Sequence, residues 1–449
     1  MKEQKLKRYN KKIFKATFSL SFIKKEVNMV MKFLQLGYKP GDDLVCLFRV
    51  EPKKGLSVRK AAETVALESS IGTWAKVGTA KDYVNRLAAK VFSIKGNLVK
   101  IAYPSDLFEK GNVPNILSSV AGNVFGMKAV NNLRLEDTQF PKSIVQGFKG
   151  PRFGINGIRD FMKVKNRPLV GTIIKPKLGL HPSDHAASAY ESWLGGCDFV
   201  KDDENLSSQK FNEFEKRLTQ TLEKADKAED ETGEKKAYLV NVTAETKQMM
   251  KRAELVEEQG GKYMMIDMLT EGFGALQTLR EMNLKLAIHA HRAMHAAITR
   301  NEKHGISMMV LADFARLIGM DTLHIGTGIG KLEGNINEIE EIEEEIEQGK
   351  VKETKLRLSH NWHHIKPILA VCSGGLNPCH VPFLMKHLGK DIVIQAGGGI
   401  HGHPGGSRAG AMALRQAVDA VLKGKSLQEY SKEAPELETA YKLWGKIKW

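Results

Sequence analysis

The run Val200–Asn205, VKDDEN, places one lysine directly before three carboxylates. If the run is extended as far as Asp203, the alternation of side chains puts Lys201 and Asp203 on one face, with Glu204 at the following turn. Hard cations such as Mg2+ take oxygen ligands, which an ammonium cannot supply, but a neutral lysine that adds CO2 becomes an oxygen-bearing carbamate anion. Lys201, Asp203 and Glu204 would then form a site of three oxyanions. The alternative is a solvated acidic turn, which these residues alone favour.

Two glycine-rich turns offer a complementary site for an anion. Ser373-Gly374-Gly375 and Gly397-Gly398-Gly399 each follow an apolar run. Glycine lets backbone N–H groups approach an anion closely, although either turn alone is equally typical of an ordinary tight turn. A third stretch, Gly326–Gly334, holds four glycines around Lys331. It predicts either a mobile lid that carries a cation onto a substrate or a flexible surface turn.

The pattern after Pro168 indicates the scaffold that gathers these residues. Apolar β-rich runs alternate there with helix-length polar segments. Continuous apolar strands with long crossovers indicate buried parallel strands, and eight of them predict a closed (β/α)8 TIM barrel. The predicted strands are Leu169–Ile174, Asp198–Lys201, Tyr238–Thr243, Tyr263–Met268, Leu284–His289, Thr322–Gly326, Ile368–Ser373 and Ile392–Ala396.

Catalytic groups of such barrels lie at the carboxyl ends of the strands, where this chain concentrates unusual side chains. Besides the Lys201 run, these are Lys175, Lys177, Asn241, Thr243, His289, His291, Arg292 and His324. A single lysine or histidine at a strand end is more often capped or solvated, so the inference depends on the convergence of several strands. The glycine turns follow strands seven and eight, the usual phosphate site of the fold, and Arg292 with His324 would hold a second phosphate. These residues predict metal-assisted enolisation of a bisphosphorylated sugar.

The rest of the chain suggests the domain organisation. Residues 32–150 predict a smaller α+β domain of ferredoxin-like type, from strand-like runs at Leu44–Val50, Ala88–Phe92 and Leu98–Tyr103 and a helical run at Ala61–Leu67. The barrel is expected over residues 151–430, and residues 431–449 are expected to form a helical tail. The segment Asn335–Gln348 predicts one outer helix, because isoleucines recur in it at helical spacing.

Composition narrows the function classes. With 42% apolar and 27% charged residues among 449, the chain is typical of a soluble globular protein. Its four cysteines lack paired spacing, which indicates a reducing, cytoplasmic compartment, and no apolar run is long enough to cross a bilayer. The formal charge is +16, but residues 1–30 hold nine Lys or Arg against two Glu, which leaves +9 for the remainder. The excess therefore belongs largely to a basic N-terminal extension, residues 1–31, and does not call for nucleic acid.

Together these motifs resemble the large subunit of ribulose-1,5-bisphosphate carboxylase/oxygenase, Rubisco. The resemblance runs from about residue 40 to 425. It is carried by ESSIGTW (68–74), GNVFG (122–126), LRLED (133–137), GTIIKPKLGL (171–180), GGCDFVKDDEN (195–205), HAHRAMH (289–295), HIGTGIGKLEG (324–334), SGG (373–375) and QAGGGIHGHPGG (395–406). Ile173, where plant-type chains have threonine, and the run after Lys201 are most similar to the archaeal type III and II/III intermediate groups.

The resemblance implies Mg2+-dependent carboxylation of ribulose 1,5-bisphosphate to two molecules of 3-phosphoglycerate through an enediolate, with O2 as the competing substrate, in AMP salvage. It implies that activator CO2 carbamylates Lys201, which binds one Mg2+ with Asp203 and Glu204. Lys175 and His291 are expected to transfer protons, and Lys331 to stabilise the new carboxylate and pair with Glu68. Substrate contacts are implied for Thr73, Trp74, Asn123, Lys177, Arg292, His324, Ser373, Gly374, Gly375, Gln395, Ala396, Gly397 and Gly398.

The same resemblance implies an assembly. In the family, the counterparts of Glu68, Thr73, Trp74 and Asn123 come from the small domain of a neighbouring subunit. We therefore expect a homodimer with shared active sites, with rings of dimers as a larger option, and no small subunit, nucleic acid or membrane partner.

Two other functions compete with this one. A Rubisco-like protein shares the barrel and the metal site but enolises or isomerises a sugar phosphate in methionine salvage. Such proteins typically lose several carboxylase positions, whereas Lys331, Glu68, Asn123 and Thr73 are all present here. A basic RNA-binding or scaffold protein would suit the charge but leaves the lysine, carboxylate and glycine residues unexplained.

Overall fold

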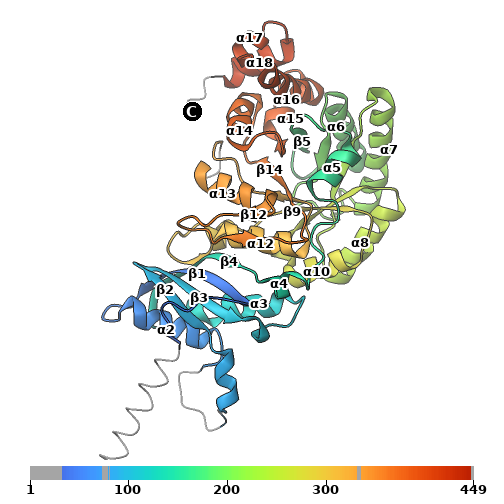
Figure 1. The fold of residues 1–449 in the computed structure, drawn as a ribbon. Helices are drawn as coiled ribbons and strands as arrows, with labels where there is room; N and C mark the ends of the chain where they lie inside the picture. Colours follow the sequence, from blue (N-terminus) through green and yellow to red (C-terminus); the bar gives the residue numbers. More distant parts are fainter. Residues whose placement is uncertain (1–32, 73–78, 80, 331–334, 446–449) are drawn as a thin grey trace, which may run out of the picture. The chain divides into compact units, whose positions relative to one another are not determined.

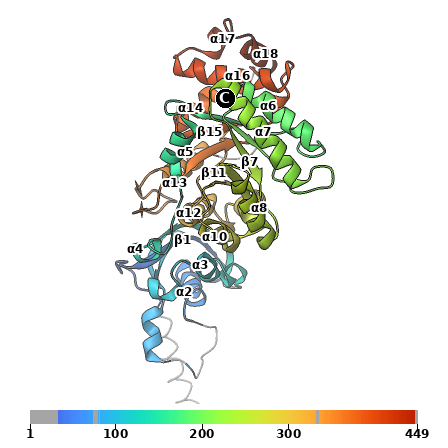
Figure 2. The same cartoon turned by 90° about the vertical axis from the view of Figure 1, so that its right-hand side faces the viewer.

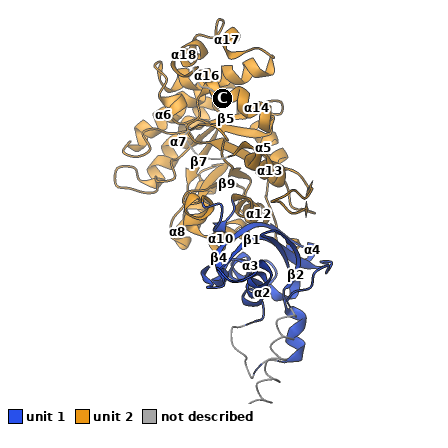
Figure 3. Cartoon of the chain, turned by 90° about the vertical axis from the view of Figure 1, so that its left-hand side faces the viewer, with its two compact units in different colours: residues 1–144, 301–307 blue, residues 145–300, 308–449 orange. Residues whose placement is uncertain are grey.

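The computed structural model describes residues 33–72, 79, 81–330 and 335–445. It divides into two compact units, one of residues 1–144 with 301–307 and the other of residues 145–300 with 308–449 (Figure 3). The basic extension and three of the predicted site residues, Thr73, Trp74 and Lys331, lie outside the described residues.

The first unit is a five-stranded sheet with helices, which confirms the predicted α+β domain. Its strand order is β10 (Gly305–Ile306), β4 (Val130–Gln139), β1 (Asp43–Pro52), β3 (Leu98–Pro104) and β2 (Lys90–Lys95). Its main helices are α2 (Val58–Glu68) and α3 (Val113–Val120), and the side chain of Ser57 caps α2 by accepting a hydrogen bond from the Lys60 N–H. The short strand β10 comes from residues 301–307 and pairs in parallel with β4.

The second unit is a closed barrel of eight parallel strands, as predicted (Figure 1). Around the barrel the strands are β5 (Leu169–Ile173), β6 (Phe199–Lys201), β7 (Ala237–Asn241), β8 (Tyr263–Asp267), β9 (Ala287–His291), β11 (Thr322–His324), β14 (Leu369–Ser373) and β15 (Ile392–Gln395). Strand five begins three residues later than expected and continues through His291. Strand two ends at Lys201, so the direction of Asp203 is set by a turn and not by the pleat of the strand.

The barrel interior is filled from its amino-terminal end. Helix α5 (Gly154–Met162) packs Ile155, Ile158 and Met162 against the first inward-facing residues of the strands, among them Leu169, Phe199, Ala237, Tyr263, Ala287 and Leu369. The buried carboxylate of Asp321 fixes the start of this helix by accepting from the N–H groups of Phe153 at 2.7 Å and Gly154 at 2.9 Å. With one end packed with apolar side chains, the opposite end is left for polar chemistry.

Helices cover the outside of the barrel. They include α6 (Pro182–Leu194), α7 (Phe214–Thr232), α8 (Thr246–Glu258), α10 (Phe273–Glu281), α12 (Met308–Ile318), α13 (Ile336–Glu347), α14 (Val381–Leu388), α16 (Gly406–Leu422) and α18 (Pro435–Trp444). Figures 1 and 2 show α6 and α7 running side by side. Helix α13 is the predicted outer helix, with Ile339, Ile342 and Ile346 buried. Among the described helices, none has both the length and the apolar character needed to cross a membrane.

Candidate active site

The site residues continue the inward-facing rows of the barrel core. Because side chains alternate along a strand, a residue two positions after a core residue points into the same barrel. Phe199 lies in the core and Lys201 follows on its face, just as Tyr263 and Met265 of the core are followed by Asp267. The core of the barrel thus sets the direction of the polar side chains at its carboxyl end.

Lys201 is completely buried at the end of β6. Its Nζ donates to the carbonyl oxygen of Asp202 at 2.7 Å and to Sδ of Met265 at 3.0 Å, and it lies 4.0 Å from Oε2 of Glu204. Burial lowers the pKa of Lys201, although the surrounding carboxylates act in the opposite direction. A larger fraction of this amine is therefore uncharged, and so nucleophilic, than in a solvated lysine.

The carboxylates of Asp203 and Glu204 are held beside that amine. Oδ2 of Asp203 accepts from Nζ of Lys175 at 2.7 Å, and Oε2 of Glu204 lies 3.7 Å from Nε2 of His291. Burial opposes ionisation of Glu204, but His291 and Lys201 outweigh it and lower its pKa. The carboxylates of Asp203 and Glu204, beside a lysine that can gain carbamate oxygens, match the all-oxygen donor set of a hard divalent cation.

Three histidines line the other side of the site. Nδ1 of His291 lies 2.8 Å from Oδ1 of Asp267, and Nδ1 of His289 lies 2.8 Å from Oγ1 of Thr322. The ring of His324 packs edge-on against both, with centroids 4.7 Å from His289 and 4.8 Å from His291. Burial lowers the pKa of His289 and of His324 well below the ordinary value, so both rings are neutral.

The glycine turns lie next to these groups. A Cβ at Gly397 would stand 3.0 Å from Cε of Lys175, so any other residue here would crowd this lysine side chain and shift it slightly. A Cβ at Gly330, the last described residue before Lys331, would stand 2.7 Å from the carbonyl oxygen of Gly374, which brings the base of the predicted lid to the strand-seven turn. Gly375 has a φ of 78°, which other residues rarely adopt.

Arg292 borders the stretch after strand six. A Cβ at Gly326 would stand 2.9 Å from Nη2 of Arg292. Burial lowers the pKa of Arg292 to about 10, which still leaves the guanidinium charged at neutral pH. A fixed positive charge beside neutral His324 is suited to bind a phosphate.

The contacts bring together Lys175, Lys201, Asp203, Glu204, His291, His324 and Gly397. Lys177 is exposed and donates to Oδ1 of Asn205 at 3.0 Å. Ser373, the last residue of β14, pairs in register with Gln395 of β15. Gln395 is 1% exposed, and neither the oxygen nor the nitrogen of its side-chain amide has a hydrogen-bond partner among the described residues. Ala396 is also buried, and its backbone carbonyl oxygen accepts from Oγ1 of Thr172 at 2.8 Å.

Two predicted residues belong to the first unit. Glu68 is the last residue of α2 and is half-buried, and Asn123 is an exposed residue at the start of a 3-10 turn, Asn123–Gly126.

Sequence reasoning missed Asp267 and His401. Asp267 is the last residue of strand four, and the strand-end rule that selected the other residues also points to it. The ring of His401 lies between Oγ1 of Thr172 at 3.0 Å and Oγ of Ser407 at 2.9 Å, contacts that no sequence pattern signals.

Comparison with known proteins identifies the family. The family described as "Ribulose bisphosphate carboxylase large chain, catalytic domain" matches residues 154–444, and the corresponding N-terminal domain matches residues 32–144. The ribulose bisphosphate carboxylase of Methanocaldococcus jannaschii is 50% identical over 429 residues, 92% of this chain and 100% of the relative. A solved structure titled as a dimeric archaeal Rubisco from Hyperthermus butylicus matches with a TM-score of 0.88 and 44% identity, covering 93% of this chain and 100% of that one. An octameric Rubisco from Pyrococcus horikoshii matches with a TM-score of 0.87 and 48% identity, covering 94% and 99%. The chain therefore belongs to the ribulose bisphosphate carboxylase large-chain family.

Proposed function

We propose that this protein carboxylates ribulose 1,5-bisphosphate to two molecules of 3-phosphoglycerate, with oxygenation as a side reaction. The observation that carries the proposal is the buried amine of Lys201, 4.0 Å from Oε2 of Glu204, in a barrel mouth where Lys175 pairs with Asp203. Membership of the family and about half-identity to named carboxylases support the same activity.

Activation begins at Lys201. Its neutral amine attacks CO2, the new N–C bond forms, and the nitrogen loses a proton to water, which leaves a carbamate anion. The carbamate oxygens, with the carboxylates of Asp203 and Glu204, would hold Mg2+. Bound there, Mg2+ supplies a Lewis acid that polarises the substrate carbonyl and stabilises negative charge on its oxygen.

The protein's own groups position the substrate and move protons. The glycine turns at residues 374–375 and 397–398 would bind one phosphate, and Arg292 with His324 the other, so that the middle carbons lie above Lys201. Loss of the C3 proton gives the enediolate, whose C2 attacks CO2. His291, oriented by Asp267 at 2.8 Å, accepts a proton from water as it adds at C3. Lys175 then delivers a proton to C2 after the C2–C3 bond breaks.

The proposal includes the assembly and the metabolic role. A homodimer would let Glu68, Thr73, Trp74 and Asn123 of one subunit complete the site of the other, as the family resemblance implies. The solved relatives are described as dimeric and octameric, which supports an assembly of this large chain alone. The resemblance to archaeal type III members favours consumption of ribulose bisphosphate that derives from AMP.

A labelling experiment tests the reaction. The protein is preincubated with Mg2+ and bicarbonate, then given ribulose 1,5-bisphosphate and labelled CO2, and acid-stable label is measured in 3-phosphoglycerate. We expect label from the wild type and from K210A, a change at an exposed lysine of the same loop, and none from K201A. If the wild type gives no more label than K201A, the carboxylase proposal is wrong. Exchange of the C3 proton without label would indicate an enolase or isomerase.

A further inference from the structure

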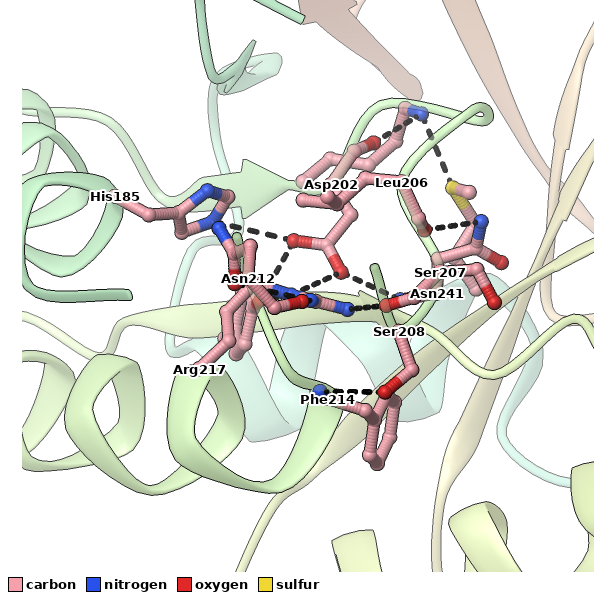
Figure 4. Close-up of polar contacts among 12 residues, drawn as sticks. His185, Asp202, Leu206, Ser207, Ser208, Asn212, Phe214, Arg217 and Asn241 are labelled. Carbon is pink, nitrogen blue, oxygen red and sulfur yellow. Dashed lines mark hydrogen bonds and ion pairs between the residues drawn. The ribbon is translucent and has the colours of Figure 1, made fainter. Parts of the chain in front are cut away.

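Asp202 lies in the sequence between the residues of the proposed metal site, and its side chain points toward His185 and Arg217 (Figure 4). Its side chain is 0% exposed. Oδ2 accepts from Nε of Arg217 on α7 at 3.1 Å and from the N–H of Asn241 on β7 at 2.9 Å. Oδ1 accepts from the hydroxyl of Tyr238 at 2.5 Å and lies 3.2 Å from Nε2 of His185 on α6. Both oxygens thus have partners inside the protein, on α6, α7 and β7.

The charge on this carboxylate is stable. Burial alone would favour the protonated acid, but Arg217 and His185 outweigh it and lower the pKa of Asp202 far below its ordinary value. In return Asp202 raises the pKa of Arg217 against the effect of burial. The two form a buried ion pair, and removing either charge would leave the other buried without compensation.

The backbone of Asp202 is fixed as firmly as its side chain. Its N–H donates to the carbonyl oxygen of Leu239 at 3.2 Å, and its own carbonyl oxygen accepts from Nζ of Lys201 at 2.7 Å. The amine of Lys201 is therefore oriented by a peptide group that the buried ion pair holds in place.

Arg217 extends this restraint along the following loop, residues 203–212. Its Nη2 donates to the carbonyl oxygen of Ser207 at 2.8 Å, and its Nη1 donates to the carbonyl oxygen of Asn212 at 3.1 Å. Nδ2 of Asn241 donates to the carbonyl oxygens of Glu204 at 3.2 Å and Leu206 at 3.0 Å. One guanidinium, oriented by Asp202, thus bonds to both the middle and the end of the loop that carries Asp203 and Glu204.

We propose that Asp202 is a positioning residue for the cation site: with Arg217 it holds the loop in the conformation that presents the Asp203 and Glu204 carboxylates to Lys201. This rests on the proposed function, because it takes those three residues as the ligands of a divalent cation. It also accounts for three consecutive acidic residues. The first is directed into the protein as an anchor, and the next two face the barrel mouth.

The test compares two buried carboxylates at opposite ends of one strand. D202N retains the size of the side chain but removes its charge and turns a donor toward Arg217. D198N does the same directly before β6, where Asp198 pairs with Arg167 at 2.6 Å and accepts from the N–H of Val170 at 2.8 Å, both outside residues 203–212. A third variant, R217K, retains a positive charge for Asp202 but lacks the planar set of donors that reaches Ser207 and Asn212.

Mn2+ binding to the full-length protein in bicarbonate buffer is measured from the electron paramagnetic resonance signal of free Mn2+, and folding is checked by circular dichroism. We expect the Mn2+ affinity to fall about 10- to 100-fold in D202N and in R217K, the range typical of residues that orient metal ligands. In D198N the affinity is expected to stay within about threefold of wild type, even if that variant unfolds more easily.

Wild-type Mn2+ affinity in folded D202N or R217K would overturn the proposal, as would an equal loss in D198N or absence of Mn2+ binding by the wild type. If D202N does not fold, R217K decides. The outcome is separable from the carboxylase activity: a wild type that binds Mn2+ but forms no 3-phosphoglycerate leaves the positioning role intact, and an active wild type whose D202N variant binds Mn2+ normally refutes it.

Discussion

Replacing Asp267 by asparagine is expected to lower kcat without unfolding the protein. Asp267 is 3% exposed, and its Oδ1 lies 2.8 Å from Nδ1 of His291. The carboxylate can only accept a hydrogen bond, so it favours the tautomer that carries a proton on Nδ1, in which Nε2 of His291 can accept a proton. Asparagine has the same shape but offers either a donor or an acceptor, so the ring loses its fixed tautomer and its orientation.

The size of the effect follows from the strength of that hydrogen bond. A hydrogen bond to a charged group contributes about 1.5–3 kcal/mol. Since each 1.36 kcal/mol changes a rate about tenfold, its loss in the transition state corresponds to a decrease in kcat of about 10- to 150-fold. The phosphate contacts are untouched, so we expect the KM for ribulose 1,5-bisphosphate to stay within about threefold of wild type.

The assay is the steady-state rate of labelled CO2 incorporation by activated enzyme, over a range of ribulose bisphosphate concentrations. D160N is the matched control, because Asp160 is an exposed carboxylate, 72% accessible, whose only described ion pair is with Lys165 at 3.8 Å. A D267N protein that is folded and retains kcat within twofold of wild type would show that His291 needs no partner on Nδ1, and the proposed role of this pair would be wrong.

Three further outcomes are expected. Burial lowers the pKa of His401 to about 4, so between pH 6.5 and 4 the unfolded chain binds a proton that the folded chain does not. The free energy of unfolding should therefore fall by at most about 3 kcal/mol as the pH is lowered across that window. Urea denaturation at a series of pH values should show a smaller fall in H401Q than in the wild type. In G398A the added Cβ meets no atom of the described residues within 4 Å but would occupy space proposed for the phosphate, so we expect a higher KM and an unchanged kcat. G397A should also lower kcat, because its Cβ stands 3.0 Å from Cε of Lys175. An unchanged KM in G398A would mean that the phosphate binds elsewhere. F199A should destabilise the barrel by about 3–5 kcal/mol in urea denaturation, since Phe199 is 1% exposed in the barrel core, and a loss below about 1 kcal/mol would contradict the packing described.

The barrel was predictable because its strands have a simple sequence signature. Strands of a closed parallel barrel are buried on both faces, so they appear as continuous apolar runs, and all eight were located. Strand β4 was not predicted, because VNNLRLEDTQ mixes polar with apolar residues. Strand β10 was not predicted, because a strand of two residues has no periodic pattern. The ends of strands were less certain than their presence, as β6 and β9 show.

The site was predictable to the extent that it depends on strand ends. Lys201, His291 and His324 combine an unusual residue type with such a position. Asp267 has the same position, but a single aspartate at the end of an apolar run is common and does not stand out in the sequence. The roles of Arg217 and Tyr238 arise only from folding, because α7 and β7 are brought to Asp202 from 15 and 36 residues along the chain.

Strand β10 has a consequence for how the protein is made. The sheet of the first unit draws on residues 301–307: Nη1 of Arg134 donates to the carbonyl oxygen of Asn301 at 2.7 Å, and Oγ of Ser307 donates to that of Glu136 at 2.6 Å. A ribosome synthesises chains from the amino terminus, so the first 144 residues are complete long before these partners exist. The edge of β4 that pairs with β10 therefore lacks its partner until five strands of the barrel have been translated. Nascent chains of intermediate length expose that edge, which makes them the stage of synthesis most open to misassociation between neighbouring polypeptides.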